Sequence, residues 1–177
     1  MSILSIINGY KNNNCKNGHF LFMLRDRLCN KNNFPDEYGI YIIYDNTKYS
    51  NSNNSGGIDS LLYIGMSGTV NNNYNIRECK KTPRSWIFST QTLKGRIARK
   101  YGSNVTICGK KNNYLSRESF YKIIMKRDGI SELRFEYYVT YSKNGLCSFK
   151  FPFMAEAELI NQYLLNFGCL PPWNKSM

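Results

Sequence analysis

Runs of apolar residues alternate along this chain with polar segments, and the spacing of the apolar residues predicts the elements. Residues 38–45 and 60–66 are almost continuously apolar, which is typical of buried strands. The Asn- and Ser-rich segment 46–59 between them is too polar to bury itself, so we expect a mobile hairpin loop that joins an antiparallel pair. Residues 133–141 alternate and are rich in Phe, Tyr, Val and Thr, which predicts a third strand.

Other stretches have apolar residues at helical spacing. Thr92 is a suitable N-cap for a helix that ends at Tyr101, and a second helix is expected over residues 116–127. The last helix is expected over residues 154–166, and Gly168 just beyond it suits a left-handed cap.

The segment before the first strand is expected to be an extension. Within it, residues 19–28 place Phe and Leu at helical spacing, which predicts a short helix. We therefore divide the 177 residues into an N-terminal extension, residues 1–37, and one domain, residues 38–177, which is an ordinary size for a single domain.

The chain is strongly basic: 24 Lys and Arg residues against 12 Asp and Glu residues give a formal net charge of +12 and a pI near 9.5. Such a surplus favours a polyanionic partner, although it also serves solubility. Segment 67–91 interleaves basic with aromatic residues, which suits contacts with a phosphate backbone and bases, and a solvated insertion is the alternative. Its basic residues are Arg77, Lys80, Lys81 and Arg84.

Signals for a zinc site or a membrane segment are weak. The six cysteines form no closely spaced pair and His19 is the only histidine, so free cytosolic thiols are favoured over a closed zinc site. No apolar run approaches the roughly 20 residues that span a bilayer, and the short apolar N-terminus lacks a charged leader. We expect a cytoplasmic protein with no membrane association.

Tyr41 and Tyr63 lie in the two apolar strands, each two residues from a glycine, Gly39 and Gly65. A glycine inside a strand often marks the close approach of a ligand or of another backbone. The two phenols are therefore candidates for chemistry, although most of the 14 tyrosines must be ordinary core residues.

The helix expected after Thr92 is basic on part of its surface. Arg96 and Lys100 are four residues apart and share a face, which could present a guanidinium and an ammonium to one phosphate. Lys94 and Arg99 add further positive charge. A solvated basic helix face is the alternative interpretation.

The last helix carries two carboxylates, Glu156 and Glu158. Glu156 lies on the apolar stripe formed with Leu159, Ile160 and Tyr163, whereas Glu158 falls off this stripe and is expected to face water. A carboxylate on a buried stripe is costly unless it is paired or binds a metal. Glu156 is therefore the candidate metal ligand, with a structural ion pair as the alternative.

Taken in order, these segments resemble the GIY-YIG nuclease family. The family shares a GIY strand, a YIG strand, a helix with L-x-x-R, a later helix with E-x-x-L-I and a P-x-x-N-like end. The matching segments, between about residues 38 and 175, are Gly39-Ile40-Tyr41, Tyr63-Ile64-Gly65, Leu93 to Arg96, Glu156 to Ile160, and Pro171-Pro172-Trp173-Asn174.

The resemblance implies a mixed α/β (α+β) fold with a small three-stranded antiparallel sheet flanked by helices. It also implies hydrolysis of DNA phosphodiester bonds with a divalent metal, Mg²⁺ or Mn²⁺. By this resemblance, Glu156 would hold the metal and Arg96 would steady the scissile phosphate. Tyr41 and Tyr63 would position or deprotonate the attacking water, and Asn174 would support the site from the chain end.

The chain departs from the family pattern in loop lengths and at one position. The loops on both sides of the second tyrosine strand are longer than usual, which leaves Arg77 and Arg84 as rivals of Arg96 for the scissile phosphate. Met66 stands where many members have a lysine, and Lys100 is the candidate source of the missing charge.

The chain is short and extends little beyond these motifs. We therefore expect a stand-alone type II restriction endonuclease that cuts double-stranded DNA as a homodimer. A phage-type or repair-type endonuclease of loose specificity is one alternative. A DNA-binding module that has the fold but does not cleave is another. The residues do not reveal the recognition sequence, the cut position or which tyrosine is the base.

Overall fold

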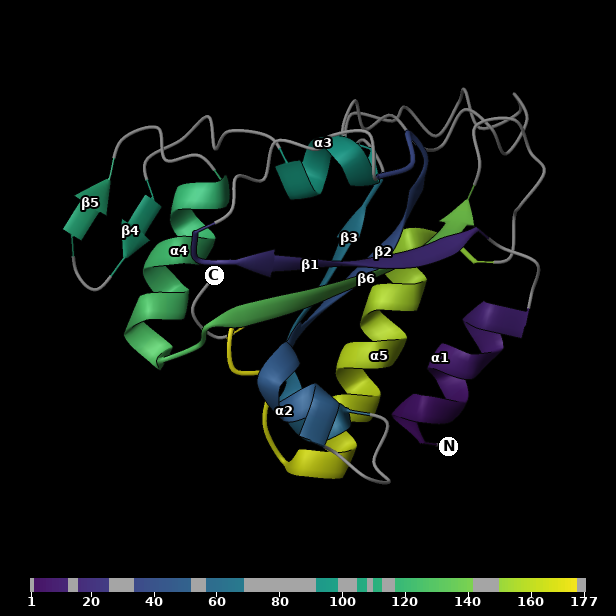
Figure 1. Ribbon diagram of the computed structural model, residues 1–177. Helices are drawn as coiled ribbons and strands as arrows, with labels where there is room; N and C mark the ends of the chain where they lie inside the picture. The colour runs from purple at the N-terminus through teal and green to yellow at the C-terminus, as the bar shows by residue number, and fades with distance from the viewer. Residues whose placement is uncertain are drawn as a thin grey trace.

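The structure is an antiparallel sheet flanked by helices, which confirms the mixed α/β class expected from the sequence (Figure 1). The computed structural model describes residues 2–12, 16–25, 34–51, 57–68, 92–98, 105–107, 110–112, 117–141 and 150–174. Within these ranges, the backbone alone is described at residues 98, 105–107 and 110–112.

The sheet has four strands in the order β1-β6-β2-β3, and all neighbours are antiparallel. The strands are β1 (Asn17–Met23), β2 (Tyr38–Asp45), β3 (Leu61–Ser67) and β6 (Glu132–Tyr141). The expectation of three strands is wrong, because the N-terminal segment supplies β1, which pairs along β6. Two short strands, β4 (Val105–Ile107) and β5 (Lys110–Asn112), form a separate pair.

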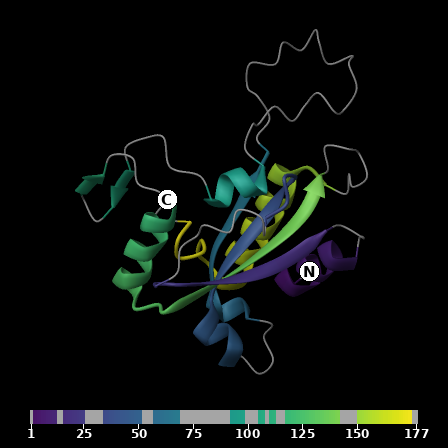
Figure 2. The same ribbon diagram turned by 45° about the horizontal axis from the view of Figure 1, so that its top comes forward.

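Helices cover both faces of the sheet (Figure 1). They are α1 (Ile3–Asn12), α2 (Asn46–Asn51), the 3-10 turn η2 (Ile58–Ser60), α3 (Leu93–Ala98), α4 (Arg117–Asp128) and α5 (Pro152–Phe167). One hydrophobic cluster joins α3 and α4 to the sheet face that carries Tyr41 and Tyr63, and the other joins α1 and α5 to the face that carries Ile40 and Ile42. Figure 2 shows the same division from a view tilted by 45°.

Strand β1 replaces the helix expected over residues 19–28. Phe20 and Phe22 point to the same side of the sheet: Phe20 stacks on Phe135 with ring centroids 4.5 Å apart, and Phe22 is only 2% exposed. Leu21, between them, is 47% exposed. A run this short fits helical and strand spacing equally well, so the expectation failed because packing against β6 decides the conformation.

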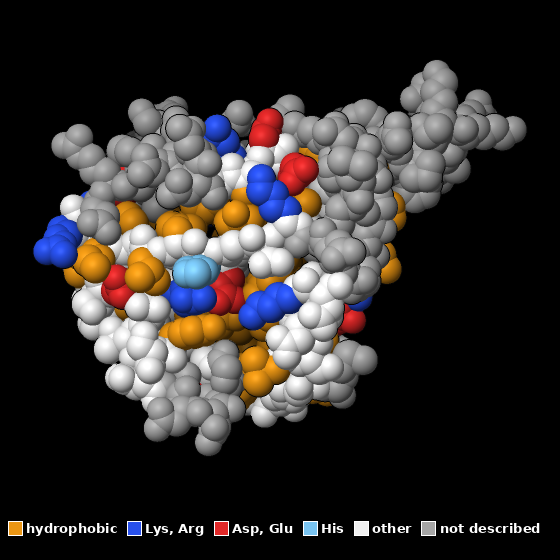
Figure 3. Space-filling view, turned by 45° about the vertical axis from the view of Figure 1, so that its right-hand side comes forward, with side chains coloured by type: hydrophobic (Ala, Val, Ile, Leu, Met, Phe, Trp, Pro, Cys, Tyr) orange, Lys and Arg blue, Asp and Glu red, His pale blue; other side chains and the backbone are white. Residues whose placement is uncertain are grey.

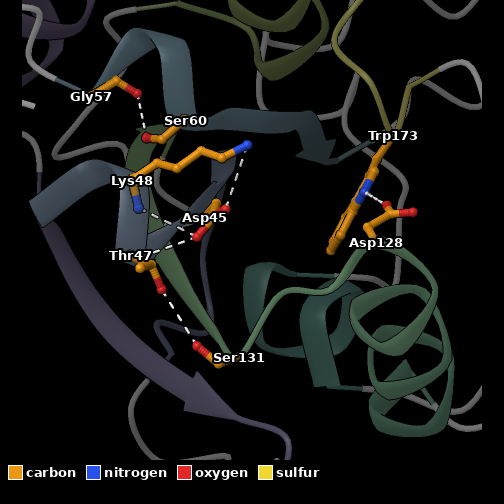
Figure 4. A network of polar contacts seen from close by, with 8 residues as sticks. All are labelled: Asp45, Thr47, Lys48, Gly57, Ser60, Asp128, Ser131 and Trp173. Carbon is orange, nitrogen blue, oxygen red and sulfur yellow. Dashed lines mark hydrogen bonds and ion pairs between the residues drawn. The ribbon is translucent and has the colours of Figure 1, made fainter. Parts of the chain in front are cut away.

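The segment 46–59 is also more regular at its ends than a mobile hairpin loop. Helix α2 follows β2 directly because the Asp45 carboxylate accepts hydrogen bonds from the backbone N–H groups of Thr47 (3.1 Å) and Lys48 (3.5 Å), as Figure 4 shows. Turn η2 precedes β3, and the Ser60 hydroxyl donates to the carbonyl oxygen of Gly57 (Figure 4). Residues 52–56 lie outside the described residues.

Five of the other predicted elements are confirmed by the structure. Strands β2, β3 and β6 and helices α4 and α5 agree with the sequence within a few residues. The predicted end of the helix after Thr92, at Tyr101, lies outside the described residues. Helix α5 ends at Gly168, which has a positive φ of 66° and donates its N–H to the Leu164 carbonyl oxygen at 2.8 Å.

Among the described residues, no helix is both long and apolar enough to cross a lipid bilayer.

Candidate active site at the edge of strand β3

Tyr41 and Tyr63 bring their rings together over Gly65. Tyr41 on β2 lies opposite Gly65 on β3, and the centroids of the two phenol rings are 5.7 Å apart. A Cβ atom on Gly65 would lie 2.5 Å from Cε1 of Tyr63 and 2.7 Å from Cζ of Tyr41. Gly65 is therefore the residue that lets both phenols occupy the same side of the sheet edge.

Gly39, the first residue of the GIY segment, has a different reason to be glycine. A Cβ atom at this position would lie 2.0 Å from the Tyr138 carbonyl oxygen on β6, next to a register shift between Tyr38 and Gly39. Both glycines thus mark close approach, as expected, but Gly39 admits a neighbouring backbone and Gly65 admits the candidate catalytic side chains.

The Tyr41 hydroxyl is a buried polar group that has the Tyr63 phenol as a polar neighbour. The side chain is fully buried, and its oxygen has no hydrogen-bond partner of acceptable geometry among the described residues. A buried hydroxyl without a partner is costly, and such groups often belong to binding or catalytic sites. This oxygen lies beside Tyr63 and Gly65, where a bound water or substrate oxygen could satisfy it.

The Tyr63 hydroxyl lies near the same point and is also deprived of solvent. Burial raises the pKa of Tyr63 above its ordinary value, and the neighbouring phenols of Tyr41 and Tyr121 and the carboxylate of Glu156 raise it further. Tyr63 therefore stays protonated at neutral pH and can donate a hydrogen bond.

Glu156 reaches the same region from the first half of α5. Burial raises the pKa of its carboxyl from 4.5 to about 7, and two contacts oppose this shift: the nearby Arg96 guanidinium and a hydrogen bond from the backbone N–H of Met66. The carboxyl is half-buried. It is thus held between the end of β3 and helix α3, beside the Tyr63 phenol.

Arg96 belongs to the short helix α3, which begins as the sequence predicts. The Thr92 carbonyl accepts the Arg96 N–H at 2.7 Å, and the Thr92 hydroxyl accepts the Gly95 N–H at 3.5 Å. Leu93 and Ile97 are fully buried on the side of α3 that faces the sheet, and Arg96 and Lys94 are half-buried. This orientation places the Arg96 guanidinium next to Glu156.

The C-terminal segment closes the outer edge of β3. Asn174 pairs with Ile64 as a neighbouring strand would, because its Oδ1 accepts the Ile64 N–H at 2.9 Å and its Nδ2 donates to the Ile64 carbonyl at 2.8 Å. The backbone N–H of Trp173 donates to the Leu62 carbonyl at 2.8 Å. Asn174 therefore supports the strand that carries Tyr63, and it acts through the backbone.

The structure brings together residues that are far apart in the sequence: Tyr41, Tyr63, Arg96, Glu156 and, through the β3 backbone, Asn174. Lys94 lies on the same helix as Arg96. The remaining predicted residues lie outside the described residues, and these are Arg77, Lys80, Lys81, Arg84, Arg99 and Lys100.

Glu158 differs from the expectation that it faces water. Its carboxylate accepts hydrogen bonds from the Tyr10 hydroxyl at 2.9 Å and from Lys150 Nζ at 2.5 Å. It therefore joins α5 to α1 and to the segment before α5. Helical spacing correctly separated the two carboxylates of α5, but it could not show that the second one is also paired.

Sequence reasoning gave no role to two residues that belong to this arrangement, Trp173 and Asp128. Trp173 is fully buried in the same hydrophobic cluster as Tyr41 and Tyr63. Its indole Nε1 donates to Oδ2 of Asp128 at 2.8 Å (Figure 4). The motif Pro171-Pro172-Trp173-Asn174 contained the signal, but only its last residue was interpreted.

Glu156 is the group at this site that could hold a hard divalent cation. Among the described residues, no three His, Cys, Asp or Glu side chains gather in one place, so Glu156 is the carboxylate available at this site. Mg²⁺ often uses one or two protein carboxylates and fills its other positions with water and substrate phosphate oxygens. The Tyr41 hydroxyl adds an oxygen that could accept a hydrogen bond from such a water or donate one to it.

Charge on the described surface is mixed. Figure 3 shows basic and acidic side chains next to each other on one face of the molecule. Arg134, for example, donates to Glu136 on the same strand at 2.8 Å. Much of the basic surplus expected to meet DNA belongs to residues 69–91 and 99–104, which lie outside the described residues.

Comparison with known proteins gives no match to a family model, to a curated protein or to a solved structure. The functional argument therefore depends on the motifs in the sequence and on the geometry described above.

Proposed function

We propose that this protein is a metal-dependent endonuclease that hydrolyses phosphodiester bonds of double-stranded DNA. The observation that carries the proposal is the convergence of two phenols, a guanidinium and a half-buried carboxylate at one edge of the sheet. These groups come from β2, β3, α3 and α5, and a purely structural role does not require them to meet.

The arrangement suits phosphodiester chemistry. A divalent ion on Glu156 would offset the negative charge that develops on the leaving oxygen. Arg96 is suited to bind non-bridging phosphate oxygens, because its planar fork matches their geometry. Its position beside Glu156 would bring the scissile phosphate to the carboxylate.

The two phenols have different surroundings and suit different roles. The raised pKa of Tyr63 keeps its proton, so Tyr63 is suited to donate a hydrogen bond to the attacking water or to a phosphate oxygen. The Tyr41 oxygen lies beside the Tyr63 phenol and has no other polar partner of acceptable geometry among the described residues, so the attacking water would lie next to this pair. We assign the role of proton acceptor to Tyr41.

The site and the charge together favour a sequence-specific enzyme of the type II restriction class that acts as a homodimer. The +12 charge supports binding to a polyanion, and cutting both strands of a symmetric site requires two copies of the site. The presence of all the residue types of the motifs favours an enzyme over a non-cleaving module, and a phage-type or repair-type nuclease of loose specificity is the alternative enzyme.

Incubation of the protein with supercoiled plasmid DNA tests the proposal. We expect discrete fragments with Mg²⁺ or Mn²⁺ and none after chelation with EDTA. A smear of fragments would replace the restriction class by a nuclease of loose specificity. Intact plasmid at every metal concentration, together with retained DNA binding in a mobility-shift assay, would favour the non-cleaving module and contradict the proposal.

A further inference from the structure

The outer edge of β3 is held at alternate residues by groups from the C-terminal part of the chain. The Leu62 carbonyl accepts the N–H of Trp173, and Ile64 pairs through both backbone groups with the Asn174 amide. The next outward group, the N–H of Met66, donates to the Glu156 carboxylate. The outer edge of β3 therefore makes the contacts that hold the strand of Tyr63 and also the contact that holds the Glu156 carboxylate.

Besides packing in the shared hydrophobic cluster, a side-chain hydrogen bond connects this edge to helix α4. Trp173 is fully buried, and its indole N–H donates to Oδ2 of Asp128 at 2.8 Å, at the last residue of α4 (Figure 4). Asp128 also accepts two hydrogen bonds from Arg127, at 2.6 and 2.9 Å. The hydrogen bonds from Arg127 and from the indole lower the pKa of the Asp128 carboxyl, and the indole keeps an oxygen acceptor of its own, Oδ2.

We infer that Asp128 is a positioning residue for the candidate active site, acting through the Trp173 indole on the register and depth of β3. This inference rests on the proposed function for its catalytic readout. Asp128 touches no reacting group. It fixes Trp173, whose backbone N–H holds Leu62 on one side of Tyr63, while the adjacent Asn174 holds Ile64 on the other side.

The physical reason lies in the position of β3 at the edge of the sheet. β2 holds β3 from one side only, so the segment 173–174 takes the place of the missing neighbour. An edge strand without a neighbour moves more easily than an inner one, and small displacements of catalytic groups are costly in rate. Asp128 anchors this substitute neighbour to α4.

The test compares four single variants that separate the indole contact from other effects. Asp128→Ala removes the acceptor and Trp173→Phe removes the donor while keeping an aromatic ring. Asp128→Asn keeps an oxygen that can accept the indole N–H. Arg127→Ala removes the neighbouring ion pair but leaves the indole contact, so it is the matched control.

The expected result is a loss confined to the chemical step. Asp128→Ala and Trp173→Phe should each lower kcat for DNA cleavage about tenfold or more with KM changed less than about twofold. The Asp128→Ala/Trp173→Phe double variant should lose no more than either single one, since both break the same contact. Asp128→Asn and Arg127→Ala should remain within about twofold of the parent protein. Rates are measured well below the thermal midpoint of each variant.

Equal losses in Arg127→Ala, or losses that multiply in the double variant, would overturn the inference. A second measurement makes it testable without catalysis. Amide hydrogen exchange at Ile64 should accelerate about tenfold in Asp128→Ala and Trp173→Phe, and not in Asp128→Asn or Arg127→Ala. Unchanged exchange would reject the positioning role, whereas faster exchange in a protein that never cleaves DNA would reject only the proposed function.

Discussion

At the scale of single residues, the candidate site is defined by groups that are unfavourable where they stand. The Tyr41 hydroxyl is buried without a partner of acceptable geometry among the described residues, and burial raises the pKa of Glu156 to about 7. Both features lower the free energy of unfolding. Side chains without a function at the site would not be expected to keep such unfavourable positions.

Glu156→Gln should therefore stabilise the metal-free protein at alkaline pH. The folded-state pKa of about 7 lies above the ordinary 4.5, so the folded protein binds more protons than the unfolded chain between these values, and the free energy of unfolding falls as pH rises through this window. At pH 8 the variant should be more stable by about 2 kcal/mol, and the difference should vanish near pH 4. Urea unfolding in EDTA measures both values. A parent protein more stable than the variant at pH 8 would show that Arg96 more than compensates the burial of the charge.

Gly65→Ala should disrupt the meeting of the two phenols. The added methyl would lie within 2.7 Å of atoms in both rings, so one or both must move, at a cost of about 1–3 kcal/mol in stability and with a large loss of cleavage rate. Gly9→Ala in α1 is the control, because nothing lies within 4 Å of its added Cβ, and it should stabilise the helix by about 0.5–1 kcal/mol. A Gly65→Ala variant with full stability and activity would contradict the described packing.

At the scale of elements, periodicity predicted most of the sheet and helices but failed where a run was short. Tyr38–Asp45 and Leu61–Ser67 are long apolar runs with glycines at fixed places, and they form the expected antiparallel pair. The spacing of apolar residues in segment 19–28 predicts a helix, but it fits the period of a strand equally well. Pairing with β6 decides in favour of a strand. The candidate side chains were proposed from their types and spacing and from the resemblance of the motifs. The contacts of Trp173 with Asp128 and Leu62 were not, because they join segments that no local pattern relates.

Substitutions in β1 distinguish the strand from the helix. Phe22→Ala should lower the free energy of unfolding by about 3–5 kcal/mol, because Phe22 is buried against Tyr121 and Phe135. Leu21→Ala, one residue earlier on the opposite and exposed side, should change it by less than about 0.5 kcal/mol. Thermal or urea unfolding measures both. Similar losses at the two positions would argue against alternation and therefore against a strand.

At the scale of the whole molecule, the net positive charge of the chain and the position of the site both suit the proposed binding of DNA. The site lies at the end of β3 nearest α3 and α5, and β3 is the last strand of the sheet. Segment 67–91 directly follows β3 in the sequence, and its basic residues are expected to contact the phosphate backbone.

Binding to DNA should therefore depend steeply on salt. Replacing Lys80 and Lys81 together by Ala should reduce the slope of log affinity against log salt concentration by about 2, since each lost phosphate contact changes it by about 0.9. Fluorescence anisotropy with a labelled duplex, at several NaCl concentrations and in EDTA, measures the slope. Replacing Lys126, an exposed residue near the end of α4, by Ala gives the control slope. An unchanged slope in the Lys80/Lys81 variant would remove these residues from the DNA contact.

The central claim is that Tyr41, Tyr63, Arg96 and Glu156 form one metal-dependent site for phosphodiester hydrolysis. The most direct test is the single-turnover rate of plasmid cleavage in Mg²⁺ for Glu156→Gln and for Glu158→Gln, two carboxylates on the same helix with different partners. We predict that Glu156→Gln binds DNA but cleaves at least about a thousandfold more slowly. Glu158→Gln should cleave at close to the parent rate. Cleavage by Glu156→Gln at the parent rate would contradict the account.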